Sequence, residues 1–320
     1  MDPELEELLR LQKQGEDDDE SIVDVVKFRT KAEQGMRKSK LSCNMFSGSV
    51  EDIQIPVRDS HMNTGRIYRP PGSTRDEPVI VWYHGGGFCL GDVCYDDDHC
   101  YRLCVELHAV IVSLNYRLAP EHPFPIPIHD CWDGLQWVAS NRDRLQLNIG
   151  AGFILSGSSA GGNIAAVLSL LARESKDIPL TGVYLGLPIV VHPDAVPERF
   201  VKGYLSYEEN KNAPILCQKE IAALVSAYMP DPLSPLYSPL LWPSGHAGLP
   251  PTYFQVCGLD PLRDDGLIYE RMLREEYNIR TKLDIYPGVP HAFQSFTDLK
   301  VTKEFNRDMV SGFKWLLGIE

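Results

Sequence analysis

The chain has 320 residues, of which 43% are hydrophobic and 23% are charged, and its formal net charge is −13. This composition is typical of a globular protein, and the length suits one large domain or two ordinary ones. The acidic balance argues against nucleic acid and anionic membranes as partners, because both attract a basic surface. No apolar run approaches the ~18 residues that cross a bilayer, and the acidic N-terminus does not resemble a signal peptide. We therefore expect a cytoplasmic protein without stable membrane association.

The first 45 residues are expected to form a helical segment ahead of a main domain at residues 46–320. Asp2 followed by Pro3 is typical of a helix start, since aspartate caps a helix and proline fits its first turn. Leu5 and Leu8 follow at helical spacing. Residues 16–20 are all acidic, which indicates a solvated linker. Residues 21–38 are predicted to form a second helix.

The strand pattern begins at residue 50 and changes character at residue 79. The alternating stretches 50–57 and 64–69 are predicted to pair as antiparallel strands. From there on, continuously apolar strands alternate with stretches of helical pattern, which indicates an α/β fold: a mostly parallel sheet with helices on both faces. Ligands bind at the carboxyl ends of the strands in such sheets. The expected core strands are residues 79–83, 109–114, 153–155, 182–187, 252–256 and 281–286.

One connection in this pattern is unusually long. About sixty residues separate the strand that ends near Pro188 from the strand that begins near Thr252. A simple connection between neighbouring strands is much shorter, so part of this stretch is expected to be an insertion over the strand ends. Residues 218–228 within it have a helical pattern.

Ser159 lies at the centre of Gly157-Ser158-Ser159-Ala160-Gly161, between a predicted strand and a predicted helix. A strand, a sharp turn and a helix are the context of a nucleophile elbow, which holds a serine in a strained conformation and needs small neighbours. Gly157 and Gly161 are such neighbours. The helix start also places free N–H groups where an oxyanion would form. Taken alone, the pattern fits a turn of small residues that packs a helix on a sheet equally well.

Three glycines, Gly85, Gly86 and Gly87, follow His84 at the end of the strand 79–83. One interpretation is a flexible turn. In combination with a serine elbow, the N–H groups of Gly86 and Gly87 would join that of Ala160 in an oxyanion hole. His84 precedes the turn, so we expect it to brace the loop by hydrogen bonding rather than to act as a base.

A nucleophilic serine needs a histidine as general base, and in this kind of sheet the chain order is Ser, then Asp or Glu, then His. Three histidines follow Ser159. His192 lies near the start of the long connection, and His246 lies in a proline-rich stretch. His291 alone follows a late core strand, residues 281–286, and is the expected base.

The carboxylate that orients the histidine should follow the preceding strand, residues 252–256. Asp260 lies at the carboxyl edge of that strand and is the expected partner of His291. Asp264 and Asp265 come four and five residues later, where a helix is expected to begin. Negative charge is favourable near a helix N-terminus, which accounts for these two residues without a catalytic role.

Eight cysteines are present, and four of them fall between Cys89 and Cys104. Their spacings are five, six and four residues, so the Cys-x-x-Cys pairs of many metal sites are missing from this cluster. In a cytoplasmic protein we expect reduced thiols with structural roles. No metal site is predicted.

Several motifs together resemble the hormone-sensitive-lipase-like esterases of the α/β-hydrolase superfamily. The resemblance extends from about residue 50 to the end of the chain. It rests on His84-Gly85-Gly86-Gly87, on residues 116–125 and 157–163, on Asp260-Pro261-Leu262-Arg263-Asp264 and on His291-Ala292-Phe293. It implies an α/β-hydrolase fold with a helical cap built from residues 1–45 and an insertion at about residues 190–230.

The resemblance also implies roles for the residues singled out above. Ser159 would be the nucleophile, His291 the base, Asp260 the residue that orients it, and Gly86, Gly87 and Ala160 the oxyanion donors, with no metal or organic cofactor. The chain departs from the family at Ser158, where Asp is frequent, and at Ala292, where many relatives have Gly. Neither change removes a catalytic atom.

The expected function is hydrolysis of small carboxylic esters, with short-to-medium acyl groups or aromatic substrates, through an acyl-enzyme. The alternatives are an acyltransferase, an amidase or a lactonase with the same triad, or a protein that binds a small ligand without turning it over. The oligomeric state is expected to be a monomer or a homodimer. Five aromatic residues of the long connection either line a substrate pocket or pack the insertion onto the sheet: Phe200, Tyr204, Tyr207, Tyr228 and Trp242.

Overall fold

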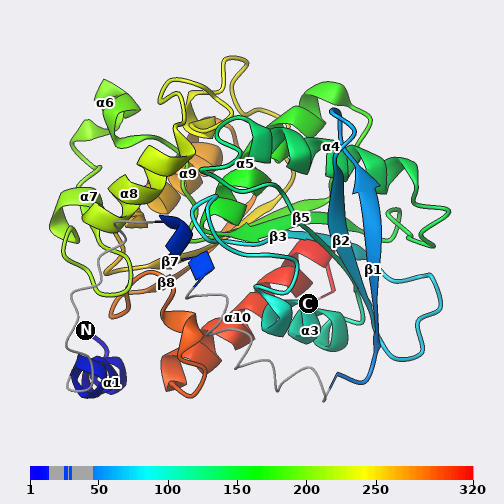
Figure 1. Cartoon of the computed structure of the whole chain (residues 1–320), viewed down its shortest axis with the longest axis horizontal. Coiled ribbons are helices and arrows are strands. Elements are labelled where there is room, and N and C mark those ends of the chain that lie inside the picture. The colour runs from blue at the N-terminus through cyan, green and yellow to red at the C-terminus, as the bar shows by residue number, and fades with distance from the viewer. Residues whose placement is uncertain (14–24, 28, 31–45, 320) are drawn as a thin grey trace.

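A computed structural model describes residues 1–13, 25–27, 29–30 and 46–319 (Figure 1). The predicted linker at residues 16–20 lies outside the described residues, as does most of the predicted helix at residues 21–38. None of the helices in the described residues has the length and apolar character needed to span a membrane.

The described residues form one eight-stranded sheet with the order β1-β2-β4-β3-β5-β6-β7-β8. β2 runs antiparallel to both β1 and β4, and the remaining neighbours are parallel. The predicted antiparallel pair and the six predicted core strands are all confirmed. The strands are β1 (Ser49–Pro56), β2 (Met62–Arg69), β3 (Val79–Tyr83), β4 (Val110–Leu114), β5 (Phe153–Ser158), β6 (Gly182–Gly186), β7 (Thr252–Cys257) and β8 (Thr281–Tyr286).

Helices cover both faces of the sheet, which explains why its central strands are continuously apolar. Alternate residues of β3 point to opposite faces: Val79 and Val81 join one hydrophobic core, and Ile80 and Trp82 join the other. The first core packs under α4 (Ile126–Ser140), α5 (Ala160–Ser175) and α9 (Arg263–Glu276), and the second under α3 (Asp97–Glu106) and α10 (Lys300–Leu317) (Figure 1).

The N-terminal helix α1 (Pro3–Lys13) begins where the sequence predicts. The N–H of Leu5 donates a hydrogen bond of 3.1 Å to Asp2 Oδ1, which caps the helix. Leu5 is fully buried in the core on the α10 side. An ion pair of 2.7 Å joins Glu4 to Lys300 at the start of α10. Helix α1 therefore packs beside α10, whereas Val25 further along the chain belongs to the opposite core.

The long connection between β6 and β7, which we call the insertion, crosses the carboxyl ends of the strands. Its longest helix, α8 (Gln218–Tyr228), coincides with the predicted range 218–228. The insertion contains the 3-10 helices η2 (Pro193–Ala195) and η3 (Pro239–Leu241) and the helices α6 (Glu198–Val201), α7 (Ser206–Glu209) and α8 (Gln218–Tyr228).

Candidate active site

Ser159 occupies the sharp turn between β5 and α5. Its backbone has φ 57° and ψ −118°, a conformation that L-residues seldom adopt and that raises the side chain above the sheet. The flanking glycines leave no room for a side chain. A Cβ on Gly157 would lie 2.3 Å from the carbonyl oxygen of Gly161, and one on Gly161 would lie 2.0 Å from that of Tyr83. The glycines thus pack the helix on the sheet, and the same turn places the Ser159 side chain at the pocket.

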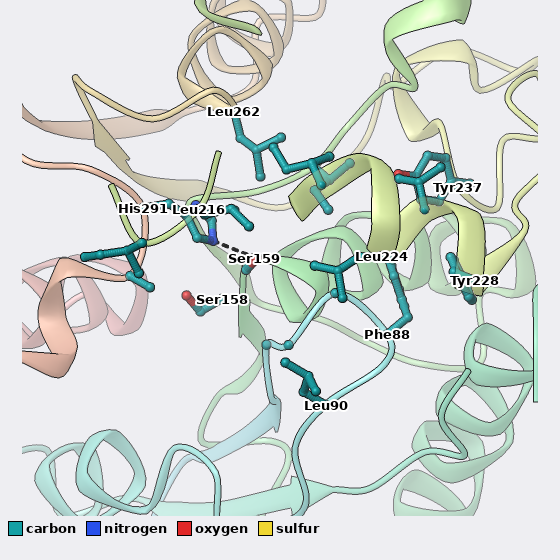
Figure 2. A pocket seen from close by; sticks show the side chains of 18 of the residues that line it. Phe88, Leu90, Ser158, Ser159, Leu216, Leu224, Tyr228, Tyr237, Leu262 and His291 are labelled. Atoms are coloured by element: carbon teal, nitrogen blue, oxygen red, sulfur yellow. Dashed lines mark hydrogen bonds between the residues drawn. The ribbon is translucent and has the colours of Figure 1, made fainter. Parts of the chain in front are cut away.

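Two hydrogen bonds connect Ser159 to His291 and His291 to Asp260. Ser159 Oγ lies 2.9 Å from His291 Nε2 (Figure 2), and His291 Nδ1 lies 2.6 Å from Asp260 Oδ2. Asp260 Oδ1 accepts a further bond of 2.8 Å from the N–H of Leu262. Both Asp260 and His291 are buried. A carboxylate on Nδ1 places the ring proton there, so Nε2 is free to accept the proton of Ser159.

The other two histidines that follow Ser159, and the neighbouring Ser156, form hydrogen bonds with other groups. His192 Nδ1 accepts the N–H of Asp194 at 3.2 Å. His246 Nε2 donates to the carbonyl oxygen of Pro239 at 3.0 Å, and burial lowers the pKa of His246 to about 4. Ser156 Oγ donates to the carbonyl oxygen of Val81 at 2.7 Å. The structure therefore brings only one of the three late histidines to Ser159.

The triple-glycine loop lies against the elbow. Gly86 and Gly87 have φ values of 105° and 59°, and both line the same pocket as Ser159 and His291. A Cβ on Gly85 would lie 3.0 Å from the carbonyl oxygen of Ser158, so the loop approaches the elbow closely. Within the described part of the chain, the N–H groups of Gly86, Gly87 and Ala160 donate no hydrogen bond. Three free donors are thus available near the serine.

His84 lies behind this loop, away from Ser159. Its Nδ1 lies 2.7 Å from the carbonyl oxygen of Gly85, and its Nε2 lies 3.2 Å from Asn115 Oδ1. The ring stacks on that of Tyr116 with the centroids 4.3 Å apart. Burial lowers the pKa of His84, which favours the neutral ring. These contacts are those of a residue that braces the loop.

The pocket above Ser159 is mostly apolar, and the insertion forms its outer wall (Figure 2). Of the five aromatic residues singled out above, Tyr204, Tyr207 and Tyr228 line the pocket. Phe200 and Trp242 are buried in the hydrophobic core instead. Both interpretations apply to Tyr228, which lines the pocket and is also buried in that core. The remaining apolar lining includes Phe88, Leu90, Ile189, Val191, Leu216, Ile221, Leu224, Val225, Tyr237 and Leu262.

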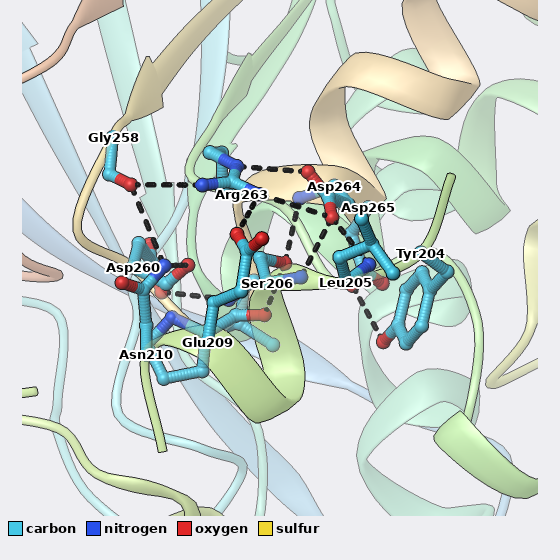
Figure 3. A network of polar contacts seen from close by, with 12 residues as sticks. Tyr204, Leu205, Ser206, Glu209, Asn210, Gly258, Asp260, Arg263, Asp264 and Asp265 are labelled. Atoms are coloured by element: carbon cyan, nitrogen blue, oxygen red, sulfur yellow. Dashed lines mark hydrogen bonds and ion pairs between the residues drawn. The ribbon is translucent and has the colours of Figure 1, made fainter. Parts of the chain in front are cut away.

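Asp264 and Asp265 have a role that the sequence did not reveal. Asp264 Oδ2 accepts the N–H groups of Leu205 and Ser206, both at 2.7 Å (Figure 3). Asp265 Oδ1 accepts the N–H of Val190 at 2.8 Å. The two carboxylates therefore connect the insertion to the start of α9. The helix N-terminus explains why both residues are acidic. That two adjacent acidic residues begin a helix on its buried side is the signal that could have indicated a further contact.

Asp265 also contacts the pocket wall. Its Oδ2 accepts the hydroxyl of Tyr204 at 2.9 Å, and its Oδ1 accepts the N–H of Val191 at 3.2 Å. Burial raises the pKa of Asp265 to about 7 despite these donors. The loop that carries Asp260 is also connected to the insertion, because Asn210 Nδ2 donates to the Asp260 carbonyl oxygen at 3.0 Å.

The seven cysteines that the structure describes are all free thiols. Within the cluster between Cys89 and Cys104, burial raises the thiol pKa of Cys89, Cys100 and Cys104. A buried protonated thiol is a poor metal ligand and a poor nucleophile. Among the described residues, no group of three or more His, Cys, Asp or Glu side chains is arranged to hold a metal ion.

Comparison with known proteins gives consistent matches. A family model described as an alpha/beta hydrolase fold matches residues 80–295, a range that begins in β3 and ends after His291. An AB hydrolase superfamily protein of Schizosaccharomyces pombe is 39% identical over 322 residues, covering 99% of this chain and 94% of the relative. Esterase LipI of Mycobacterium tuberculosis is 37% identical over 239 residues, 70% of each chain. The crystal structure of vibralactone cyclase is similar with a TM-score of 0.88 at 33% identity, covering 95% of this chain and 92% of that one.

Proposed function

The chain belongs to the α/β-hydrolase family, in its hormone-sensitive-lipase-like branch, and is a carboxylic ester hydrolase; we propose that it cleaves esters through an acyl-enzyme on Ser159. The observation that supports this mechanism is the pair of hydrogen bonds of 2.9 Å and 2.6 Å that joins Ser159, His291 and Asp260. A serine hydroxyl becomes a nucleophile only when a positioned base removes its proton.

In the first step Ser159 Oγ attacks the ester carbonyl carbon, and His291 Nε2 takes the hydroxyl proton. Asp260 stabilises the imidazolium that forms. The tetrahedral intermediate then collapses, the bond to the alcohol oxygen breaks, and His291 gives its proton to the departing alcohol. The products of this step are the free alcohol and an ester of Ser159.

In the second step a water molecule attacks the acyl-enzyme while His291 takes its proton. The carboxylic acid leaves, and the proton returns to Ser159. In both steps a negative oxygen forms near the N–H groups of Gly86, Gly87 and Ala160. Each donor aimed at that oxygen contributes about 3 kcal/mol to transition-state stabilisation in other hydrolases.

The pocket favours an uncharged substrate with an apolar acyl or alcohol part, because its lining is largely aliphatic and aromatic carbon. Short-to-medium acyl esters and aromatic esters fit this description. We propose that the part of the insertion at about residues 190–230, together with the segment 1–45, forms the cap of the domain at residues 46–320. The cap would then determine which ester is accepted.

A second candidate is transfer of the acyl group to an alcohol, or to a hydroxyl of the same substrate, in place of water. It is favoured by the apolar lining, which keeps the acyl-enzyme away from bulk water, and by the likeness to a protein described as a cyclase. Product analysis with added short alcohols separates the two candidates. Hydrolysis predicts the free acid at every alcohol concentration, whereas transfer predicts a new ester or lactone as the main product.

The test of the proposed mechanism is Ser159→Ala, with Ser158→Ala as the matched control one residue away. We expect Ser159→Ala to lower kcat/KM on p-nitrophenyl butanoate by at least about 10⁴-fold and to abolish labelling by a fluorophosphonate probe. Ser158→Ala should remain labelled. Full activity of folded Ser159→Ala, or labelling of another serine, would overturn the assignment.

A further inference from the structure

The loop that carries Gly86 and Gly87 has an unfavourable backbone conformation. Three successive residues have positive φ: Gly86 at 105°, Gly87 at 59° and Phe88 at 63°. Glycine adopts such values freely, but phenylalanine does not. A conformation of this kind persists only where the surrounding structure holds it. The contacts of the residues after Gly87 therefore matter for the direction of its N–H group.

Arg29, which lies 60 positions before Cys89 in the sequence, makes the decisive contacts. Its Nε donates to the carbonyl oxygen of Cys89 at 2.6 Å, and its Nη2 donates to that of Ala119. The N–H of Ala119 in turn donates to the carbonyl oxygen of Phe88 at 2.9 Å. Arg29 thus holds the far side of the glycine loop both directly and through residue 119. In Figure 1 the described pieces at residues 25–27 and 29–30 are drawn well apart from α1.

Glu121 fixes the guanidinium in place. Its two carboxylate oxygens accept from Nη1 and Nη2 of Arg29, each at 2.9 Å. The Arg29 side chain is only 15% exposed, whereas that of Glu121 is 48% exposed. A planar guanidinium with a bidentate partner presents its remaining donors in fixed directions. Here Nε faces the carbonyl oxygen of Cys89, and the second N–H of Nη2 faces that of Ala119.

A continuous series of peptide groups leads from Arg29 to the pocket. In a trans peptide the C=O of one residue and the N–H of the next point in opposite directions. The C=O of Cys89 accepts from Arg29, and the N–H of Leu90 in the same peptide donates to the carbonyl oxygen of Gly86 at 2.9 Å. The C=O of Gly86 shares its peptide with the N–H of Gly87. Each peptide dipole is therefore aligned with the next.

We propose that Arg29 is a positioning residue for the oxyanion hole. Arg29 orients and polarises the Gly87 N–H through the peptide groups of Leu90 and Gly87. This inference rests on the proposed function, since it takes Gly87 to be an oxyanion donor. A cation at one end of an aligned series of hydrogen bonds strengthens the donor at the other end, where the negative oxygen forms. The effect belongs to the transition state, so it should appear in kcat rather than in KM.

The experiment compares Arg29→Ala, Arg29→Lys and Glu121→Gln with Arg307→Ala in the full chain. Arg307 is the control because it forms an exposed ion pair with Glu304 on α10 and does not line the pocket. For each variant we would measure kcat, KM and the inhibition constants of two ligands. One is an aryl trifluoromethyl ketone, which forms a tetrahedral adduct with the serine, and the other is the matching methyl ketone, which binds without an oxyanion.

We expect Arg29→Ala to lower kcat about 10-fold, less than the loss of a whole oxyanion donor. Its KM and its affinity for the methyl ketone should stay within about twofold, and its affinity for the trifluoromethyl ketone should fall by the same factor as kcat. Arg29→Lys, which keeps the charge but not the fork of donors, should lie between Arg29→Ala and the natural protein. Glu121→Gln should have a smaller effect, and Arg307→Ala none.

The proposal is overturned if folded Arg29→Ala retains kcat and trifluoromethyl ketone affinity within twofold, or if both ketones lose affinity equally. Should Arg29→Ala fail to fold, the same two ketones tested on Arg29→Lys decide the question. Failure of the proposed function is a separate result, because it would appear as activity in Ser159→Ala. An inactive Ser159→Ala beside a fully active Arg29→Ala would reject only the role of Arg29.

Discussion

The two walls of the pocket are built in different ways. The sheet wall presents Ser159, His291 and Gly86, whose positions are set by backbone turns and short hydrogen bonds at the ends of parallel strands. The insertion wall presents Leu216, Leu224 and other apolar side chains on short helices. One wall places individual atoms, and the other provides shape and apolar surface. Changes in the sheet wall should therefore alter the rate for every ester, and changes in the insertion wall should alter which ester is preferred.

The walls also differ in how they are held. The strands of the sheet wall are joined by continuous ladders of backbone hydrogen bonds, and β3, β5 and β7 among them are buried along their whole length. The insertion is connected to the start of α9 mainly by Asp264 and Asp265, whose carboxylates accept N–H groups of residues 190, 191, 205 and 206. The two carboxylates thus hold the insertion wall together with the burial of Phe200 and Trp242 in the core, and they make its position sensitive to substitution of Asp264 or Asp265 and to pH.

The largest expected effect concerns the sheet wall. Asp260→Asn should lower kcat by about 10⁴-fold on every ester, because an amide no longer holds His291 in the tautomer that accepts a proton at Nε2. KM should change little. Steady-state kinetics on a panel of p-nitrophenyl esters would measure both quantities. A loss confined to one acyl length would contradict the division between the two walls.

The next prediction concerns the connection between the walls. Burial raises the pKa of Asp265 from its ordinary value of 3.8 to about 7, so between these values the unfolded chain releases a proton that the folded protein keeps. The free energy of unfolding should therefore fall as the pH rises through this window, by about 1.4 kcal/mol per pH unit. Above pH 7 this contribution is lost and the fall ends.

Asp265→Asn isolates that contribution, because an amide carbonyl still accepts the N–H groups but does not titrate. Between pH 5 and pH 7 the natural protein should lose about 3 kcal/mol of stability relative to the variant. Urea unfolding at several pH values, followed by circular dichroism, would measure the difference. Parallel pH profiles of the two proteins would show that Asp265 does not titrate in this range.

A third prediction tests the glycine loop. Gly86→Ala should lower kcat about 100-fold, the loss typical of one oxyanion donor, because the new Cβ would lie 2.4 Å from the carbonyl oxygen of Leu90 and displace the loop. Gly72→Ala is the matched control: Gly72 also has positive φ, at 71°, but no atom lies within 4 Å of a Cβ there. The control should share the backbone strain and keep its activity. Equal losses in both variants would attribute the effect to strain alone.

The smallest expected effect concerns the insertion wall. Leu224→Ala should shift the ratio of kcat/KM between long and short acyl esters about 10-fold toward the long ones, since it enlarges the pocket beside Gly87. Labelling by a fluorophosphonate probe should continue. Leu233→Ala, at a leucine that is 70% exposed, is the control. An unchanged ratio would show that acyl length is recognised elsewhere.

Much of the sheet wall could be predicted from the sequence, because it depends on local patterns. Apolar runs indicated the strands, and the positions of Ser159, Asp260 and His291 after three of them indicated that the side chains would meet. The alternatives at His192 and His246 could be set aside on the same grounds. Residues at the carboxyl ends of parallel strands necessarily share one edge of the sheet.

The insertion wall could not be predicted in the same detail. Whether Tyr204 or Trp242 faces the pocket depends on how an irregular segment folds back on the sheet, and no periodicity records that. The same holds for Arg29, which is 60 positions from Cys89 in the sequence. The sequence places Asp264 and Asp265 at a helix start. It does not indicate their contacts with residues 190–206, because these arise only in the folded chain.

The series of hydrogen bonds through His291 joins parts of the chain that are far apart. Ser159 and His291 are separated by 132 positions, and Asp260 and His291 by 31. Contacts between such distant residues form only after the intervening chain has closed, which makes them slow to appear during folding. Helical circular dichroism can return while this arrangement is still incomplete. Ester hydrolysis recovered after dilution from denaturant therefore reports completed assembly of β5, β7 and β8, and recovered circular dichroism does not.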